Sequence, residues 1–373
     1  MQILGSSELL EDVHKKDLCV DCGACVGLCP YFVSHNGKIA RLFACTLSQG
    51  RCHAHCPKTQ VDLNELSTWL TGKSYDLSAL GHVRTIVKAR AGATLTGKAG
   101  FQNGGAVSAL TVFALNQGMV DGAALTRRNG LTPEPYLART EDEVLGCSGS
   151  KYMASPTLST VMKETTDKSS MRLLVVGTAC QMTALTRMRM NPLNRDDFRD
   201  PVALSIGLFC TWALDTRQLK ALVDNRMDSD DILSMDVPPP PAQTMTFTTS
   251  KGRVDIPLAE IRTAIPKGCT ICPDMTAELT DLSVGALEGA DGWNTLIIRS
   301  EKGERLVADA VAKGFLETGP MPEESLANLE KGALGKKKRA LARAMELDLL
   351  NLDPEKGRSA LVVDRKRVDA LCS

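Results

Sequence analysis

Short apolar runs of strand length recur along the chain, and some lead into segments long enough for a helix. The runs Arg172–Gly177 and Val202–Phe209 predict buried strands, because continuous apolar stretches are typical of strands covered on both faces. Thr178–Met190 predicts the helix that follows the first of them. Strands that lead directly into helices are typical of α/β proteins, so we expect an α/β (α+β) domain.

The same pattern predicts further elements on either side of these strands. Asn103–Gln117 predicts a helix with its first residue as the N-cap and Gly118 as its stop. Trp293–Arg299 predicts a strand, Glu301–Gly303 a turn and Glu304–Lys313 a helix.

Shifts in composition divide the chain into four parts. A cysteine-rich unit comes first, then a linker for which Asn64–Leu80 has a helical pattern, then the larger domain and a basic tail. Gly335–Arg343, in the tail, predicts an exposed basic helix, since charge runs usually face solvent; docking of an acidic partner is the alternative. The predicted parts are 1–66, 67–84, 85–320 and 321–373.

Charge and hydropathy exclude several classes of partner. The chain has 373 residues, with 44 Lys and Arg balancing 44 Asp and Glu, so nothing points to nucleic acid or an anionic membrane. No secretory signal pattern is present. The longest apolar run, Val202–Leu214, is shorter than the ~20 residues that span a bilayer. We therefore expect a cytoplasmic protein without a membrane span.

Cysteine is the residue type that carries most chemical information. Seven of the 13 cysteines fall between Cys19 and Cys56. In a reducing compartment disulfides are rare, so a dense cluster of cysteines indicates metal ligation.

The first cysteine motif has the spacing of bacterial ferredoxins. Cys19, Cys22, Cys25 and Cys29-Pro match the run C-x2-C-x2-C-x3-C-P, in which three thiolates hold one 4Fe-4S cluster and the fourth points away. Gly23 removes a side chain where the backbone must loop tightly. A zinc site is the alternative, but zinc sites usually pair two C-x2-C knuckles.

A second cysteine segment, Cys45 to Cys56, follows the first motif in the sequence. By ferredoxin logic Cys56 completes the first cluster, which leaves Cys29, Cys45 and Cys52 for a second one. Three cysteines are one short of a 4Fe-4S site. Three alternatives remain for the second centre. It is a 3Fe-4S cluster, or it is a cluster with His53, His55 or another residue as the fourth ligand, or it does not form.

Four further cysteines are dispersed in the larger domain. Cys180 follows one predicted strand, Cys210 ends another, and Cys269 and Cys272 form a C-x2-C loop. Strand ends on one edge of a sheet converge, so these four thiols are candidates for another 4Fe-4S site. Any one of them alone would be read as a small buried hydrophobe.

An ordered set of phrases resembles one protein family. Phe101-Gln-Asn-Gly-Gly, Gly149-Ser-Lys-Tyr and Gly177-Thr-Ala-Cys-Gln precede Gly207-Leu-Phe-Cys and the Cys269 loop. Over about residues 15–315 the chain resembles the beta-subunit family of coenzyme F420 (deazaflavin) hydrogenases and dehydrogenases. This family includes formate dehydrogenase beta subunits and 7-hydroxymethyl chlorophyll a reductase.

The resemblance implies an FAD-binding domain with a 4Fe-4S cluster held by the dispersed cysteines, fused here to a small ferredoxin-like iron–sulfur domain. It implies two clusters, with three, or one 3Fe-4S cluster, as alternatives. It also implies hydride exchange with coenzyme F420 and a place in a hetero-oligomeric complex. Candidate partners are hydrogenase, formate dehydrogenase, heterodisulfide reductase or ferredoxin.

Three phrases are candidates for the flavin site. Gln102-Asn103-Gly104-Gly105 opens a helix, where free N–H groups and the helix dipole favour a pyrophosphate. Ser150, Lys151 and Tyr152 supply a hydroxyl, a cation and an aromatic ring, and Lys151 and Tyr152 are the candidate catalytic residues beside the flavin. The resemblance adds Gly177, Thr178 and Gln181.

Two other functions are compatible with these residues. One is a ferredoxin-dependent reductase of an organic substrate, and the other is an electron-transfer adaptor without hydride chemistry. Family membership alone does not select between them.

Overall fold

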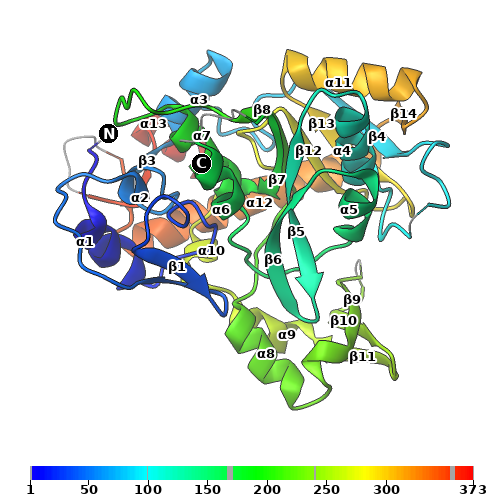
Figure 1. The fold of residues 1–373 in the computed structure, drawn as a ribbon, viewed down its shortest axis with the longest axis horizontal. Helices are drawn as coiled ribbons and strands as arrows, with labels where there is room; N and C mark the ends of the chain where they lie inside the picture. Colours follow the sequence, from blue (N-terminus) through cyan, green and yellow to red (C-terminus); the bar gives the residue numbers. More distant parts are fainter. Residues whose placement is uncertain (1, 99, 166–170, 239–240, 353–357, 373) are drawn as a thin grey trace.

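A computed structural model describes residues 2–98, 100–165, 171–238, 241–352 and 358–372 (Figure 1). At its centre lies an eight-stranded mixed sheet in the order β14-β4-β13-β12-β8-β7-β5-β6. The strands β12, β8, β7 and β5 run parallel, and the pairings at both sides of them are antiparallel. The strand bounds are β4 Thr85–Ala91, β5 Gly122–Asn129, β6 Thr132–Ala138, β7 Leu173–Thr178, β8 Val202–Leu208, β12 Leu282–Ala286, β13 Asn294–Ile298 and β14 Leu316–Pro320.

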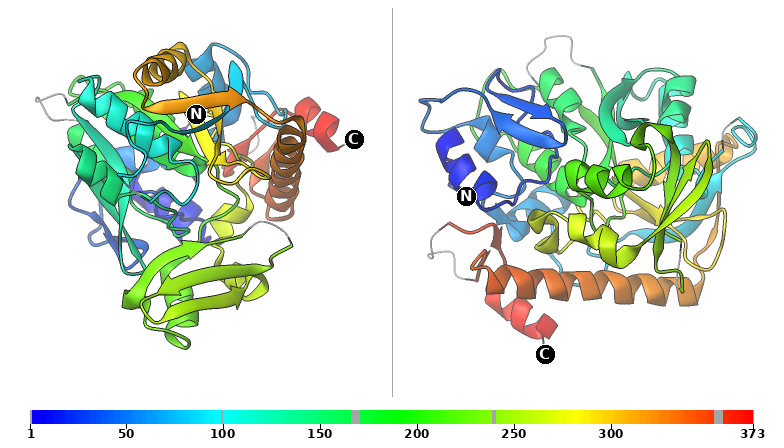
Figure 2. Two further views of the ribbon diagram at one scale, coloured as in Figure 1. Left: turned by 90° about the vertical axis from the view of Figure 1, so that its right-hand side faces the viewer. Right: turned by 90° about the horizontal axis from the view of Figure 1, so that it is seen from below.

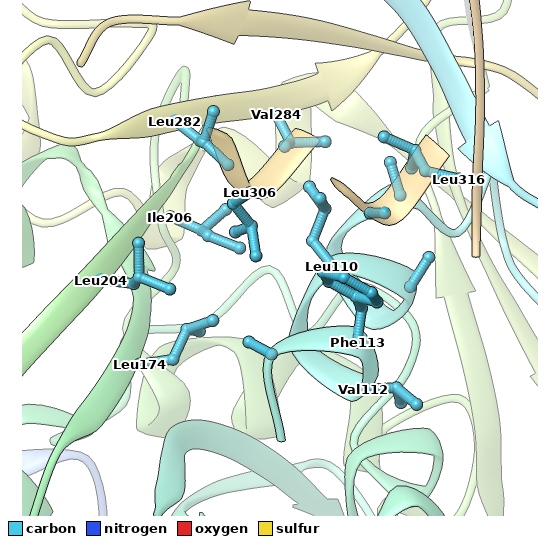
Figure 3. Close-up of a cluster of buried hydrophobic side chains, with 14 of the residues drawn as sticks. Leu110, Val112, Phe113, Leu174, Leu204, Ile206, Leu282, Val284, Leu306 and Leu316 are labelled. Carbon is cyan, nitrogen blue, oxygen red and sulfur yellow. The ribbon is translucent and has the colours of Figure 1, made fainter. Parts of the chain in front are cut away.

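Helices cover both faces of this sheet. Alternate residues of β7 point to opposite faces, with Leu174 and Val176 in one core and Leu173 and Val175 in the other. The first core packs under α4 (Ala106–Asn116), α5 (Glu141–Gly146) and α11 (Glu301–Ala312). Figure 3 shows Leu110 and Phe113 of α4 and Leu306 of α11 in this core. The second packs under α6 (Leu158–Glu164) and α7 (Ala179–Arg189). The α/β prediction is confirmed.

A smaller three-stranded antiparallel sheet projects from the domain (Figure 1). Its inner face packs on two helices through a separate apolar core that includes Met235, Phe247 and Ile261. The elements are β9 Ile232–Asp236, β10 Thr244–Thr249, β11 Gly252–Pro257, α8 Thr216–Asp224 and α9 Leu258–Ile261, with 3-10 turns at Ser229–Asp231 and Arg262–Ala264.

The N-terminal segment lies at one end of the molecule (Figures 1 and 2). It pairs with the C-terminal segment, since β16 joins β3 and β15 in a small parallel sheet. Its elements are α1 Ser6–Leu9, a π-helical turn Leu10–His14, β1 Phe32–His35, β2 Lys38–Arg41, α2 Arg51–Ala54, β3 Val61–Asp62 and α3 Leu63–Thr71. The remaining elements are α10 Lys267–Thr270, α12 Glu323–Glu346, β15 Leu350–Asn351, β16 Leu361–Val362 and α13 Arg365–Cys372.

Three predicted boundaries were wrong. The helix expected from Asn103 begins at Ala106, and its N-cap is Gly105, whose φ of 75° favours glycine. The turn expected at Glu301–Gly303 is the first turn of α11, because the Ser300 hydroxyl accepts the Gly303 N–H at 3.1 Å and caps the helix. The helix of the linker ends at Thr71, where Gly72 takes a φ of 71°.

The expected exposure of the basic tail was also wrong in its central part. Lys336 and Lys337 lie in α12 and are buried, whereas Lys338 and Arg339 face solvent. Carbonyl groups and a carboxylate surround the two buried ammonium groups and compensate their charges. In the part of the chain that is described, no helix is both long and apolar enough to cross a membrane.

Candidate functional site

Four cysteines of the N-terminal segment line one cavity. Cys19, Cys22, Cys25 and Cys56 surround it together with apolar side chains and Lys58, and we call these cysteines the N-terminal group. The structure thus places Cys56 beside the three cysteines of the ferredoxin motif, although 31 positions separate it from Cys25.

A glycine permits the tight path of this loop. Gly23 has a φ of 85°, and a Cβ there would clash with the backbone of Pro156 in the larger domain. Beside it, the carbonyl oxygen of Cys22 accepts the Leu158 N–H at 3.2 Å. The cysteine loop is therefore seated directly on the start of α6.

The environment of these thiols suits ligands of an iron–sulfur cluster. Burial raises the pKa of Cys19 to about 12 and the pKa of Cys25 well above its usual range, and neighbouring thiolates add to both effects. The backbone N–H groups of Asp21 and Ala24 approach the sulfurs of Cys19 and Cys22 and favour thiolate there. Binding of metal at such a site must displace the thiol protons.

A second set of cysteines lies further out. Cys29 is exposed, Cys45 is half-buried, and both are close enough to Cys52 to raise its pKa, after burial, to about 11. We call Cys29, Cys45 and Cys52 the outer group. His53 does not point at them, because its Nδ1 accepts the Leu4 N–H at 3.3 Å and its Nε2 lies 3.9 Å from Asp12.

His55 is the other candidate fourth ligand of the outer group. It is buried, and its Nδ1 has no hydrogen-bond partner in the described part of the chain. Burial and the nearby charges of Arg187 and Arg51 lower the pKa of His55 to about 3. The ring is therefore neutral, as a metal ligand must be.

The dispersed cysteines converge at the carboxyl edge of the central sheet. Cys180 opens α7 after β7, Cys210 follows β8, and Cys269 and Cys272 belong to the loop around α10. The Cys210 N–H donates to the Met275 carbonyl at 2.8 Å, which ties this loop to the end of β8. We call the four cysteines the dispersed group.

The four thiols lie close enough to influence one another's ionisation. Burial, followed by the charges of Cys272 and Cys269, raises the pKa of Cys180 to about 11. Burial raises the pKa of Cys210 far above its usual range, and the same two cysteines and Cys180 contribute. Four half-buried thiols this close together fit the ligand set of a 4Fe-4S cluster.

The N-terminal and dispersed groups are neighbours. Lys58 and Pro57 line the cavity of the N-terminal group and also a second cavity, which Cys180 and Cys272 line from the other side. Gly268 packs so closely on Leu18 that a Cβ would clash with its carbonyl oxygen. In the described ranges, no three His, Cys, Asp or Glu side chains are arranged to share one metal ion. A cubane differs from such a site because each thiolate binds a different iron.

A buried lysine of α12 reaches the dispersed group and its buried neighbour pairs with Glu278, and neither was predicted from the sequence. Lys336 Nζ donates to the carbonyl oxygens of Cys210 at 2.6 Å and Asp274 at 2.8 Å. Lys337 Nζ lies 2.8 Å from the buried carboxylate of Glu278. A charge run on a helix is usually solvated, so the run itself gave no signal of this role.

The two loops expected at the flavin meet at a polar cluster. Gln102 Oε1 accepts the Ser150 N–H at 2.7 Å, and Gln102 Nε2 donates to Asp236 at 2.8 Å. The Tyr152 hydroxyl donates to the same carboxylate at 3.2 Å and accepts the Val237 N–H at 3.2 Å. Asp236 connects these loops to the small sheet and was not predicted from the sequence.

Lys151 has a different set of contacts from those of its neighbours. Its Nζ donates to the carbonyl oxygens of Cys147, Ser148 and Gly149, at the carboxyl end of α5. Burial lowers the pKa of Lys151 to about 8. Its ammonium group is therefore engaged with the backbone.

Gly177, Thr178 and Gln181, the third candidate segment for the flavin site, lie at the start of α7. Gln181 Oε1 accepts the Thr178 N–H at 2.8 Å, and Gln181 Nε2 donates to the Ser155 carbonyl at 2.9 Å. A Cβ on Gly177 would lie 2.7 Å from the Met182 side chain. These residues hold Cys180 in place, since Thr178 Oγ1 lies 3.3 Å from its sulfur.

The start of α4 leaves backbone donors free. Gly104 packs against Asn294, whose Oδ1 accepts the Ala106 N–H at 3.1 Å. Over the described residues, the next two N–H groups, of Val107 and Ser108, have no hydrogen-bond partner, and both residues are half-buried. Free N–H groups at a helix start fit an anionic group such as a flavin pyrophosphate.

Comparison with known proteins identifies the family of this chain. The family described as coenzyme F420 hydrogenase/dehydrogenase, beta subunit, matches through its N-terminal part at residues 87–162 and its C-terminal part at residues 170–324. Coenzyme F420 hydrogenase subunit beta from Methanosarcina barkeri is 30% identical over 226 residues, which are 60% of this chain and 77% of that protein. The subunit from Methanococcus voltae is 32% identical over 246 residues, 64% of this chain and 85% of that protein.

A solved structure gives the same result. A chain in the xenon-derivatized F420-reducing [NiFe] hydrogenase complex from Methanosarcina barkeri superposes with a TM-score of 0.66 and 29% sequence identity. The match covers 72% of this chain and 93% of that chain. Both family matches and the cysteine groups lead to one conclusion: the chain belongs to the coenzyme F420 hydrogenase/dehydrogenase beta-subunit family.

Proposed function

We propose that this chain is an iron–sulfur flavoprotein oxidoreductase subunit that links coenzyme F420 to one-electron carriers. A bound FAD would supply hydride exchange with F420, and 4Fe-4S clusters held by the cysteine groups would take up the two electrons one at a time. The dispersed group holds the cluster nearest the flavin, and the N-terminal group holds the next. The outer group is the candidate site of a third centre.

One observation carries this proposal. Two sets of four cysteines, each at least half-buried, lie next to each other, and Lys58 lines the cavities of both. A structural thiol needs no such neighbours, whereas a relay requires successive centres close together. Lys58 lies between the two groups, and its positive charge would stabilise an electron added to a cluster in either group.

The protein side chains bind and orient the flavin under this proposal. The free N–H groups at the start of α4 bind its pyrophosphate, and Gln102 fixes the loop of Ser150 and Tyr152 beside it. Lys151 stabilises the end of α5, so a direct catalytic contact requires its ammonium group to leave the backbone carbonyls.

The proposed partner is a redox protein in a hetero-oligomeric complex, of the hydrogenase, formate dehydrogenase or heterodisulfide reductase type, or ferredoxin. A ferredoxin-dependent reductase of an organic substrate is the second candidate function. The exposed Cys29 of the outer group favours it, because a soluble carrier can reach this cysteine directly.

Iron content tests the assignment of the dispersed group. We expect Cys180→Ala, purified without oxygen, to lose about four irons per chain. Cys147→Ala is the matched control, because Cys147 is half-buried and lies near Lys151, Arg127 and Glu143 rather than any cysteine group. Equal iron in both variants would contradict the assignment.

A further inference from the structure

The loop that carries Cys45 exposes three large apolar side chains. Leu42 is 54% exposed, Phe43 62% and Leu47 66%, within six consecutive residues. The Phe43 ring makes an edge contact with Tyr31, at 6.0 Å between centroids, which gives it a defined position. Single exposed apolar residues are common on soluble proteins, but a cluster of them marks an interaction surface.

The loop that carries this apolar cluster also carries a cysteine of the outer group. Cys45 lies between Phe43 and Leu47 in the sequence, and the exposed Cys29 belongs to the same group. Cysteines of the other two groups are at least half-buried. The outer group is therefore the cysteine group from which an electron can pass most directly to a protein bound at the surface.

The charges around the cluster have one sign along the sequence. No Asp or Glu occurs from residue 22 to residue 60, whereas Lys38, Arg41, Arg51 and Lys58 do. Lys38 is exposed and Arg41, next to Leu42 in the sequence, is half-buried, whereas the half-buried Arg51 interacts with the acidic Asp197. Glu8 is an acidic residue near this loop, and its carboxylate accepts the Gly5 N–H at 3.1 Å. A cationic rim around an apolar centre complements an acidic partner and speeds its encounter.

We propose that Leu42, Phe43 and Leu47, with Lys38 and Arg41 at the rim, form the docking surface for a small acidic one-electron carrier protein. Electrons cross between this carrier and the outer group. The inference rests on the proposed relay function and adds the site and chemistry of the partner. Transient electron-transfer complexes bury little surface, so a patch of this size is sufficient.

Direct binding of an acidic plant-type 2Fe-2S ferredoxin, used as the probe, tests the proposal on the complete iron-loaded chain. We expect the double variant Phe43→Glu with Leu47→Glu to bind at least tenfold more weakly. Lys38→Glu should also weaken binding, most strongly at low salt. Leu233→Glu is the matched control, because Leu233 is 59% exposed and lies on β9 in the small sheet.

Reduction by dithionite, which needs no docking surface, is measured on the same samples with their iron content. Weaker ferredoxin binding with unchanged iron and unchanged reduction by dithionite supports the proposal. Equal binding by wild type and the double variant overturns it, and so does a loss of iron in that variant. A wild-type dimer that Phe43→Glu dissociates, with ferredoxin binding unchanged, would assign the surface to a second copy instead. Absence of iron from the wild type overturns the relay function itself.

Discussion

The ammonium group of Lys336 donates a 2.6 Å hydrogen bond to the carbonyl oxygen of Cys210. This bond joins α12 to the end of β8, beside the dispersed group. The matched family region ends at residue 324, near the start of α12, so this contact comes from beyond it. The C-terminal helix is therefore an integral part of the candidate cluster site.

Replacement of Lys336 by Met should affect both stability and redox behaviour. The carbonyl groups of Cys210 and Asp274 lose their donor, which costs about 2 kcal/mol of unfolding free energy. Loss of the positive charge should also lower the reduction potential of the nearby cluster, as measured by an EPR redox titration. Lys336→Arg should retain most of the wild-type potential.

Lys338→Met is the control for this variant, because Lys338 is the exposed neighbour on the same helix. We expect Lys338→Met to have the stability and the cluster reduction potential of the wild type. A potential that is the same in Lys336→Met, Lys338→Met and wild type would show that Lys336 does not act on the cluster.

Gly23→Ala should separate the cysteine loop from the larger domain. The substitution adds a Cβ at a φ of 85° and drives it into Pro156, so it should destabilise the loop and reduce the bound iron. Gly97→Ala has the same φ of 85° with nothing within 4 Å, and it therefore measures the backbone cost alone, about 1–2 kcal/mol. Urea denaturation and iron analysis of both variants compare the two effects.

The free energy of unfolding should decrease as the pH rises from acid to alkaline values, because of Glu278. Burial raises its pKa to about 7, while Lys337 opposes the shift. A carboxyl with a raised pKa binds its proton more tightly in the folded state, so its contribution is complete below about pH 4.5 and is lost as the pH rises through 7.

Urea denaturation at pH 5 and pH 8 measures this contribution. Wild type should lose more unfolding free energy over this interval than Glu278→Gln, by on the order of 2 kcal/mol. Glu301→Gln, at an exposed carboxylate, should keep the wild-type pH dependence. Parallel pH profiles for wild type and Glu278→Gln would refute the assignment.

Gln102→Ala should weaken flavin binding without loss of iron. Gln102 connects the loop before α4 to Ser150 and to Asp236, so its removal frees both loops. We expect about a tenfold weaker affinity for FAD, equal to 1.4 kcal/mol, by fluorescence titration. The exposed Gln117 at the other end of α4 offers the control Gln117→Ala, which should bind FAD as wild type does.

Local patterns in the sequence were sufficient for much of the fold and for the proximity of the first three cysteines. The apolar runs predicted β7 and β8 within one residue at each end, because strands buried on both faces leave a continuous signal. The spacing of Cys19, Cys22 and Cys25 fixes their approach locally, and the structure places them in one cavity with Cys56.

Contacts between distant segments had no comparable signal. Asp236 lies 134 positions from Gln102, and Lys336 lies 126 positions from Cys210. Neither residue belongs to a motif, and the lysines of α12 have the pattern of a solvated helix. The N-terminus of α4 was misplaced because Gly105 and Asn294 supply the cap that Asn103 was expected to provide.

Anaerobic titration of the purified chain with reduced coenzyme F420 tests the central claim most directly. Iron, sulfide and flavin are quantified first, and the flavin absorbance is then followed during the titration. We expect about eight to twelve irons and one FAD per chain, with bleaching of the flavin by reduced F420. About four irons, no flavin and no response to reduced F420 would contradict it.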